Sequence, residues 1–215
     1  MRTSTGGKAR LAAVVAAVAL FAAACAANSS GGGSSSSSSS GSKKIALLLP
    51  ETKTTRYEAQ DRPLFEAKVR QLCPDCQILY SNADQKADLQ QNQVDAALTN
   101  GAKVLVLDPV DSASAASIVA KAKAQNVPVI SYDRLITNAD IDYCISFNNV
   151  AVGKLQARSL VGKLKADGHG SGTIVMINGA PTDNNAKLFK QGALSVLDSG
   201  GLKIGKQYDT PDWSP

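Results

Sequence analysis

The stretch "KVLVLDPVDSASAASIVAKAKAQNVPVISYD", residues 103–133, decides the fold. Its two ends, "KVLVLD" and "VPVISYD", are short apolar runs that predict strands. Between them, apolar side chains recur at helical spacing over residues 112–125, namely Ala115, Ile118, Val119 and Ala122. A strand, a helix and a second strand at this spacing predict a βαβ unit, in which the two strands are parallel.

The same alternation extends along the chain in both directions. Apolar runs predict further strands at "KIALLL", "QILYS", "DYCISF", "TIVMIN" and "KIGKQYD", the first of them covered on both faces. Helical spacing predicts helices at about 61–72, 87–100, 149–166 and 184–199. The second of these carries Val94, Ala97 and Leu98, with Gly101 as its C-terminal cap, and the last carries Phe189, Ala193, Val196 and Leu197. The prediction is an α/β fold with doubly wound parallel sheets.

Polar side chains gather where the predicted strands end. Asp108 ends one strand, Asp133 and Arg134 end the next, and Asp183 and Asn185 follow "TIVMIN". In parallel sheets, ligands bind outside the carboxyl ends of the strands. A charge at the tip of a buried strand also needs a partner or hydrogen bonds. We therefore predict a polar crevice at these strand ends. Asp183 can instead cap the helix that follows it, and one residue can do both.

The first 25 residues are typical of an export signal. Three basic residues precede an uncharged apolar run, Leu11–Ala24, which is shorter than the roughly 20 residues that span a bilayer. The segment "LFAAAC" resembles a bacterial lipobox, in which Cys25 is lipidated, although Ala22 stands where Leu is usual. We predict a lipoprotein on the outer face of the cell membrane, or a periplasmic protein. The alternative is ordinary cleavage nearby and free secretion.

Residues 26–43 predict a disordered tether. They consist almost entirely of Gly, Ser and Ala, and Gly/Ser runs behave as flexible coil. After a lipidated cysteine, such a tether holds a domain near a membrane without inserting it. A low-complexity linker without an anchor has the same flexibility.

The charge balance gives no support to a nucleic-acid partner. The chain has 23 Lys and Arg against 18 Asp and Glu, but three of the basic residues lie in the signal, which carries no acids. The remainder has 20 basic residues against 18 acidic ones, a net charge of +2. The sequence also lacks a basic stripe with interleaved aromatics.

The cysteines fit export. Cys73 and Cys76 form "CPDC", which predicts a short structural disulfide, with a reduced pair as the alternative. A redox CxxC motif opens a helix after a strand, whereas this pair follows a helical pattern. A zinc site needs a second ligand pair, which the lone His169 cannot supply, so we predict no metal. Cys144, in a predicted strand, is expected to be a small buried hydrophobe.

Two motifs for other chemistry are weak. "GHGSGT", residues 168–173, resembles a phosphate loop but precedes a strand, so we interpret it as a turn that leaves His169 in solvent. Asp133 and Asp183 could form the carboxylate pair of a secreted glycosidase. However, we expect their neighbours to favour the ionised forms, whereas a general acid needs a raised pKa. No catalytic residue is predicted.

Two long strings carry a resemblance to a known family. "YDRLITNADIDYCISFNNVAVGKLQA" and "PTDNNAKLFKQG" resemble the D-xylose-binding proteins among the substrate-binding proteins of bacterial ABC sugar importers. The resemblance covers residues 44–215 and implies a two-lobe fold of the periplasmic binding protein type. Residues 44–149 would form the N-terminal lobe and residues 150–215 part of the C-terminal lobe. It implies a monomer without cofactor that binds a monosaccharide, with xylose expected, and delivers it to a membrane permease.

The family's sugar contacts carry over where the motifs match. They imply seven ligand-binding residues: Arg56, Tyr57, Asp133, Arg134, Asp183, Asn185 and Trp213. The family usually has Trp where Tyr57 stands, and this loop is one residue longer. Carboxylate, amide and guanidinium groups suit sugar hydroxyls, and an aromatic face suits the C–H face of a sugar ring. Asp133 and Arg134 would then form a hydrogen-bonded clamp on the sugar and not a stray ion pair.

The family continues beyond the point that corresponds to Pro215. We therefore expect an incomplete second lobe, an exposed apolar face on its sheet and weakened ligand binding. A sugar-sensing lipoprotein that signals to a membrane kinase or chemoreceptor is the alternative function.

Overall fold

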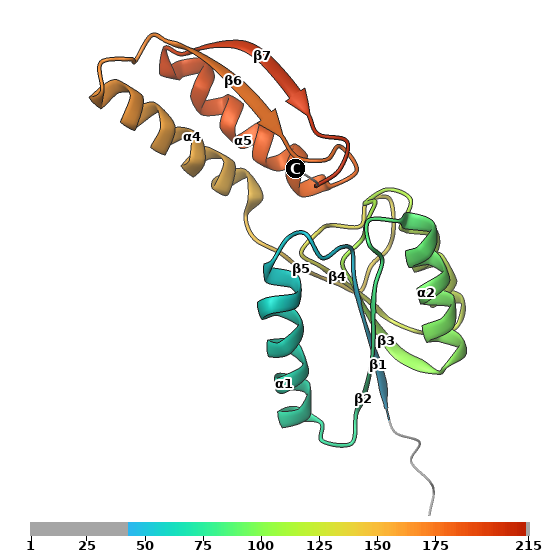
Figure 1. Cartoon of the computed structure of the whole chain (residues 1–215). Helices are drawn as coiled ribbons and strands as arrows, with labels where there is room; N and C mark the ends of the chain where they lie inside the picture. Colours follow the sequence, from blue (N-terminus) through green and yellow to red (C-terminus); the bar gives the residue numbers. More distant parts are fainter. Residues whose placement is uncertain (1–42, 214–215) are drawn as a thin grey trace, which may run out of the picture. The chain divides into compact units, whose positions relative to one another are not determined.

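The computed structural model describes residues 43–213 (Figure 1). The predicted signal segment at residues 1–25, its lipidation residue Cys25 and the tether through residue 42 lie outside this part of the chain.

A five-stranded parallel sheet forms the first half of the described chain. Its order is β2-β1-β3-β4-β5, which confirms the predicted parallel α/β fold. Because β1, β3 and β4 are neighbours and parallel, their carboxyl ends meet at one edge of the sheet. The strands are β1 (Lys44–Leu49), β2 (Gln77–Asn82), β3 (Ala102–Leu107), β4 (Val129–Tyr132) and β5 (Tyr143–Ile145).

Helices cover both faces of this sheet, and Figure 1 shows α1 and α2 on opposite sides of it. One core joins α2 and α3 to alternate strand residues such as Leu48 and Leu105. The other packs Tyr57 and Phe65 against Leu47 and its neighbours. The helices are η1 (Tyr57–Asp61, a π-helix), α1 (Arg62–Leu72), α2 (Ala87–Thr99) and α3 (Ala116–Ala124). Gly101 follows α2 with a φ of 82°, as its predicted role as a cap requires.

Helix α3 begins later than the predicted residue 112. The carboxylate of Asp111 accepts hydrogen bonds from the backbone N–H groups of Ala113 and Ser114. These bonds hold the chain in turns, and the regular helix starts only at Ala116. An Asp side chain that satisfies local N–H groups offers the backbone an alternative to the helix.

The second half of the described chain is a smaller α/β unit. Strands β6 and β7 form a two-stranded parallel sheet, and their inward side chains pack against α4 and α5. The two helices approach closely at Gly153 and Gly192: a Cβ atom on either would lie 2.1 Å from a backbone carbonyl oxygen of the other helix. The elements are α4 (Asn149–Ala166), β6 (Thr173–Asn178), α5 (Asn184–Gly200) and β7 (Lys203–Asp209).

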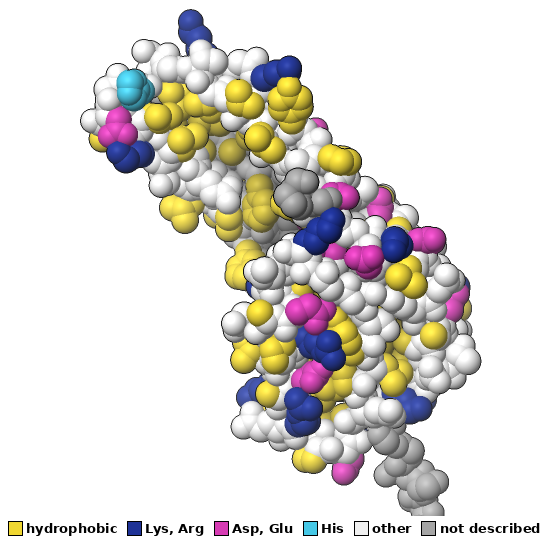
Figure 2. Space-filling view, in the orientation of Figure 1, with side chains coloured by type: hydrophobic (Ala, Val, Ile, Leu, Met, Phe, Trp, Pro, Cys, Tyr) yellow, Lys and Arg dark blue, Asp and Glu magenta, His cyan; other side chains and the backbone are white. Residues whose placement is uncertain are grey.

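The other face of the β6–β7 sheet is open. Val175 and Ile177 alternate with the inward Ile174 and Met176, and they are 60% and 73% exposed. Figure 2 shows yellow hydrophobic side chains at the surface of the part of the molecule that holds these strands. An exposed apolar face was expected for this sheet.

The cysteines behave differently from one another. Cys73 and Cys76 are joined in a disulfide. Cys144 lies in β5, but it is exposed, so the prediction that it is buried is wrong. The reason is that β5 is the edge strand of the sheet and none of its three residues is covered. His169 lies exposed in the connection before β6, as predicted.

Within residues 43–213, no helix has the length and the apolar composition that crossing a membrane requires. The same residues bring together no group of three or more His, Cys, Asp and Glu suited to a metal ion.

Candidate functional site

The seven predicted ligand-binding residues line one cavity, which we call the site cavity. Its volume is about 310 Å³, at the lower end of the range for small-molecule pockets. Residues from both halves of the described chain contribute to it. They are Thr54, Arg56, Tyr57, Asp133, Arg134, Phe147, Asn149, Asp183, Asn185, Phe189 and Trp213. That the seven bind a ligand stays a prediction.

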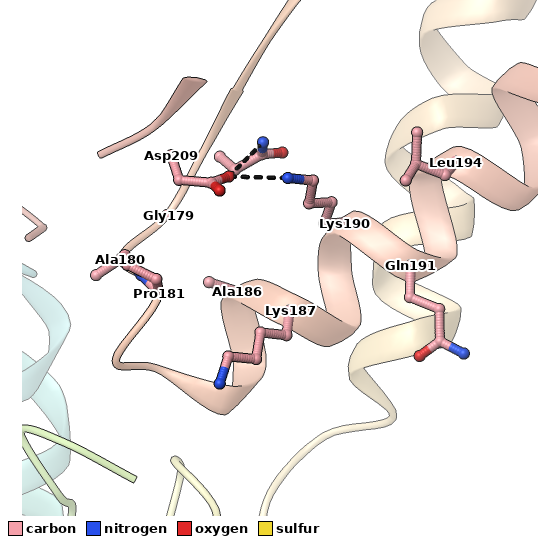
Figure 3. A pocket seen from close by; sticks show the side chains of 10 residues that line it. Gly179, Ala180, Pro181, Ala186, Lys187, Lys190, Gln191, Leu194 and Asp209 are labelled. Carbon is pink, nitrogen blue, oxygen red and sulfur yellow. Dashed lines mark hydrogen bonds and ion pairs between the residues drawn. The ribbon is translucent and has the colours of Figure 1, made fainter. Parts of the chain in front are cut away.

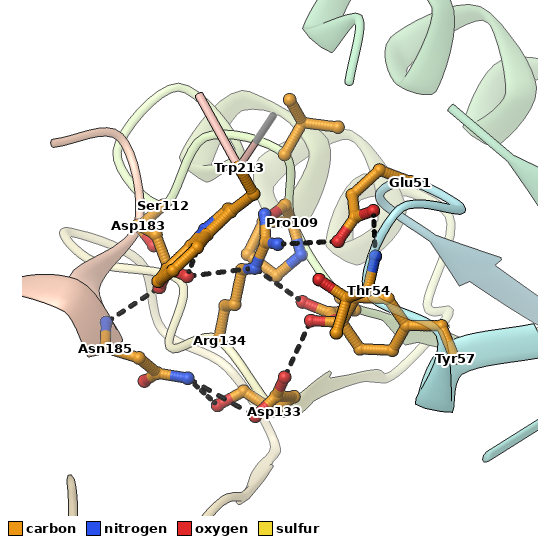
Figure 4. Close-up of polar contacts among 12 residues, drawn as sticks. Glu51, Thr54, Tyr57, Pro109, Ser112, Asp133, Arg134, Asp183, Asn185 and Trp213 are labelled. Carbon is orange, nitrogen blue, oxygen red and sulfur yellow. Dashed lines mark hydrogen bonds and ion pairs between the residues drawn. The ribbon is translucent and has the colours of Figure 1, made fainter. Parts of the chain in front are cut away.

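Asp133 joins the β1–α1 segment to α5 (Figure 4). Its Oδ2 accepts hydrogen bonds from Arg56 and from the hydroxyl of Tyr57, the latter at 2.8 Å. The side-chain amide of Asn185 donates to its backbone oxygen at 3.1 Å and to Oδ1 at 3.3 Å. Asn185 in turn accepts from Asn149 at 2.8 Å. Asp133 has a φ of 56°, a left-handed backbone that is costly for a non-glycine residue. The chain therefore turns sharply at the end of β4 to place this carboxylate.

Arg134 does not pair with its neighbour Asp133, and the two side chains contact different groups; that they clamp a ligand stays a prediction. The Arg134 guanidinium lies 3.1 Å from Asp183, 3.5 Å from Glu51 and 3.6 Å from Asp108. The left-handed turn at Asp133 explains the difference, because it sends the adjacent side chains to different partners. Arg134 is 4% exposed, so these contacts are made away from water and are not a surface ion pair.

Asp183 both caps helix α5 and lines the site cavity. Its roles as a helix cap and as a polar group of the crevice are therefore compatible. Its Oδ1 accepts from the backbone N–H of Asn185 at 2.7 Å, which caps α5. Its Oδ2 accepts from the indole N–H of Trp213 at 3.0 Å and contacts Arg134. The Trp213 ring lies against Gly179, where a Cβ atom would come within 2.1 Å of it. The absence of a side chain at Gly179 therefore makes room for the indole.

Burial dominates the electrostatics of this site. It raises the pKa of Asp183, although Arg134 and the hydrogen bonds to Asp183 act to lower it. The neighbours of Asp183 therefore favour its ionised form, as expected, but burial outweighs them, so the expectation that the surroundings as a whole act against a raised pKa is wrong. Burial likewise raises the pKa of Tyr57, so its hydroxyl stays protonated and remains a donor to Asp133.

Several residues at the site were missed from the sequence. Glu51 is fully buried, and its Oε2 accepts from the backbone N–H groups of Lys53 and Thr54 at 2.5 and 2.8 Å. It thereby shapes the loop that carries Arg56. Glu51 follows the end of β1, so the rule about carboxyl ends of strands could have found it. Phe147, Asn149 and Phe189 gave no comparable signal, because their place at the cavity depends on tertiary packing.

A second cavity, of about 420 Å³, lies among the ends of β6 and β7 and the first half of α5 (Figure 3). Its charged groups are largely paired with one another, since Asp209 accepts from Lys190 at 3.0 Å and from Asn178 at 2.8 Å. None of the seven predicted residues lines it. The candidate site is therefore the smaller cavity of Figure 4.

The chain is similar in sequence to known proteins. A family model described as "Periplasmic binding protein domain" matches residues 45–215. The D-xylose-binding periplasmic protein of Escherichia coli (strain K12) is 34% identical over 176 residues, which are 80% of this chain and 51% of that protein. The multiple sugar-binding periplasmic receptor ChvE of Rhizobium radiobacter is 42% identical over 138 residues, 59% of this chain and 39% of that one.

The fold is also similar to that of solved binding proteins. A carbohydrate transporter solute binding protein from Chloroflexus aurantiacus, in complex with D-glucose, is 33% identical with a TM-score of 0.65. The match covers 75% of this chain and 48% of that one. The chain spans about half the length of the D-xylose-binding relatives that it matches.

Proposed function

Because the chain belongs to the periplasmic binding protein domain family, whose members are binding proteins and not enzymes, we propose that it binds a monosaccharide in the site cavity. One observation carries the proposal. The seven residues that the sequence predicts as sugar contacts come from four separate segments of the chain, and they line a single cavity of about 310 Å³. This holds although they are spread from residue 56 to residue 213.

The chemistry of the cavity suits a neutral polyol. A sugar hydroxyl both donates and accepts, and the cavity offers carboxylates, an amide and guanidinium groups within one small volume. The indole of Trp213 and the ring of Phe189 supply apolar surface for the C–H face of a sugar ring. Asp133 is held by donors from two different segments, so its orientation is fixed before a ligand arrives. A site that is organised in advance loses less entropy on binding.

We take D-xylose as the ligand to test first. Two relatives at 34% identity are named for binding it, one from Escherichia coli and one from Haemophilus influenzae. ChvE, at 42% identity over a shorter stretch, is named for binding several sugars, so other monosaccharides are the natural competitors.

Tryptophan fluorescence tests the ligand directly. Trp213 is the only tryptophan of the chain, so a change in its emission reports from the site cavity. Titration of the full chain with D-xylose into the millimolar range is expected to give a saturable change at lower concentration than ribose, arabinose or glucose. Replacing Asn185 by Ala should weaken binding about tenfold or more, because its amide then no longer holds Asp133.

The matched control is Asp95→Ala, which removes an exposed ion pair with Lys121 and a long hydrogen bond from Gln91, none of them residues of the site cavity. It should leave the titration unchanged. A saturable response to none of the four sugars, with the chain folded by circular dichroism, would contradict the proposal.

The role in the cell is proposed from the same relatives. The chain would act outside the cytoplasm as the receptor of an ABC sugar importer, held at the membrane by a lipid on Cys25. If so, the full chain should be found in the membrane fraction of producing cells, and Cys25→Ser should release it. Equal membrane association of the variant would exclude the anchor and leave sugar binding untouched.

A further inference from the structure

Around Arg134, which lines the site cavity, the chain buries more acids than bases. Glu51 and Asp108 are fully buried, and Asp183 is 3% exposed. Arg134 lies within 3.6 Å of a carboxylate oxygen of each of the three. One guanidinium cannot balance three buried negative charges, and a buried acid without a partner takes up a proton instead.

Hydrogen bonds indicate which acid holds the proton. Asp183 accepts from two N–H donors, and Glu51 also accepts from two. N–H donors stabilise the ionised form of a carboxyl group. In the described part of the chain, neither carboxylate oxygen of Asp108 accepts a hydrogen bond of ordinary geometry. The nearby hydroxyl of Tyr57, which lowers the pKa of Asp108, donates to Asp133 instead. The contact of Asp108 with Arg134, at 3.6 Å, is also the longest of the three.

We propose that Asp108 is a positioning residue that packs against Arg134 as a neutral carboxylic acid. Asp108 does not line the site cavity, so it acts on a ligand only through Arg134. With Asp108 neutral, the guanidinium is shared by the two carboxyl groups that accept N–H hydrogen bonds: Glu51, which follows β1, and Asp183 at the start of α5. An ionised Asp108 would compete with Asp183 for Arg134 and so weaken a link between the two halves of the chain.

The groups around Asp108 shift its pKa in opposite directions. Burial raises the pKa of Asp108 well above its ordinary value, and Arg134 lowers it. Asp133 and Asp183 raise it further, and Tyr57 lowers it. Glu51 reaches it through their shared partner, Arg134.

The direction of the pH effect follows from proton binding. Between the ordinary pKa of Asp and the raised value in the fold, the native chain holds a proton that the unfolded chain has released. The free energy of unfolding therefore falls as pH rises through the folded pKa. Asp183, whose pKa burial also raises, contributes in the same direction, so variants must separate the two residues.

Urea denaturation of the full chain across neutral pH tests the assignment without any ligand. The wild-type midpoint should fall as pH rises. In Asp108→Asn, which resembles the neutral acid, this fall should be smaller, and the equilibrium constant for unfolding at pH 7 should not increase. The matched variant Asp183→Asn removes a charged partner of Arg134, and it should increase that constant by on the order of a hundredfold.

Two results would overturn the proposal. One is that Asp108→Asn destabilises as strongly as Asp183→Asn and keeps the wild-type dependence on pH. The other is the absence of a C=O stretch of a protonated carboxyl group from infrared spectra of the folded wild type at neutral pH. This measurement does not depend on whether Asp108→Asn folds. If that stretch is present and persists in Asp183→Asn and Glu51→Gln, Asp108 is its source.

Discussion

Strands β1 and β6 look alike in the sequence and end in different surroundings. "KIALLL" and "TIVMIN" are both runs of apolar residues that lead to a polar strand end. In β1 the last four residues are buried, because the strand lies between β2 and β3 and helices cover both faces. In β6 every second residue is exposed, because α4 and α5 cover only one face.

The difference shows that an apolar run predicts a strand but not what covers it. Burial of an apolar side chain depends on a second layer that comes from elsewhere in the chain. The five-stranded sheet has that layer on both faces, and the two-stranded sheet has it on one. Stability should therefore be unevenly distributed between the two halves, in a way that paired substitutions can measure.

The largest expected effect is the loss of a buried side chain from the five-stranded sheet. Leu105 in β3 has no exposed surface, so Leu105→Ala should reduce the free energy of unfolding by about 2–5 kcal/mol. Ile177 in β6 is 73% exposed, and Ile177→Ala should reduce it by less than about 1 kcal/mol. Urea denaturation of both variants, followed by circular dichroism, measures the contrast.

A similar loss in both variants would mean that the open face of β6 is covered in solution. Sedimentation at several protein concentrations would then show whether a second copy of the chain covers it. A loss for Ile177→Ala that disappears on dilution would identify self-association.

The sequence was sufficient for the elements and their order. Every predicted strand is present. Helix α4 has the predicted bounds, because apolar residues spaced over 18 positions fit the period of a helix and not that of a strand. It was less reliable where a side chain bonds to its own backbone. Asp111 delays α3 by four residues, and no apolar pattern records that.

The candidate site was predicted in part, for a physical reason. The rule that ligands bind at the carboxyl ends of parallel strands located Asp133, Arg134 and Asp183. It could not say which charges pair, because pairing depends on the left-handed turn at Asp133. That turn sends the side chains of Asp133 and Arg134 to different partners. The prediction for Cys144 failed likewise, because an edge strand and a central strand can carry the same residues.

A smaller effect is expected at the contact between α4 and α5, which supports one wall of the site cavity. A Cβ atom at Gly153 would lie 2.1 Å from the carbonyl oxygen of Phe189, and Phe189 lines the cavity. Gly153→Ala must therefore push the two helices apart, which should cost about 1–3 kcal/mol as overpacking does. The shift should also change the fluorescence of Trp213, which lines the same cavity.

Gly162→Ala is the matched control, since it makes the same change in the same helix. Gly162 has open space around it, so Ala should stabilise the chain by up to about 1 kcal/mol through its higher helix propensity. Opposite signs for the two variants would show that close packing of backbone, and not helix propensity, holds α4 against α5. If Gly153→Ala also stabilised the chain, the contact between α4 and α5 would have space for a methyl group. The second half would then be less tightly packed than its inward face indicates.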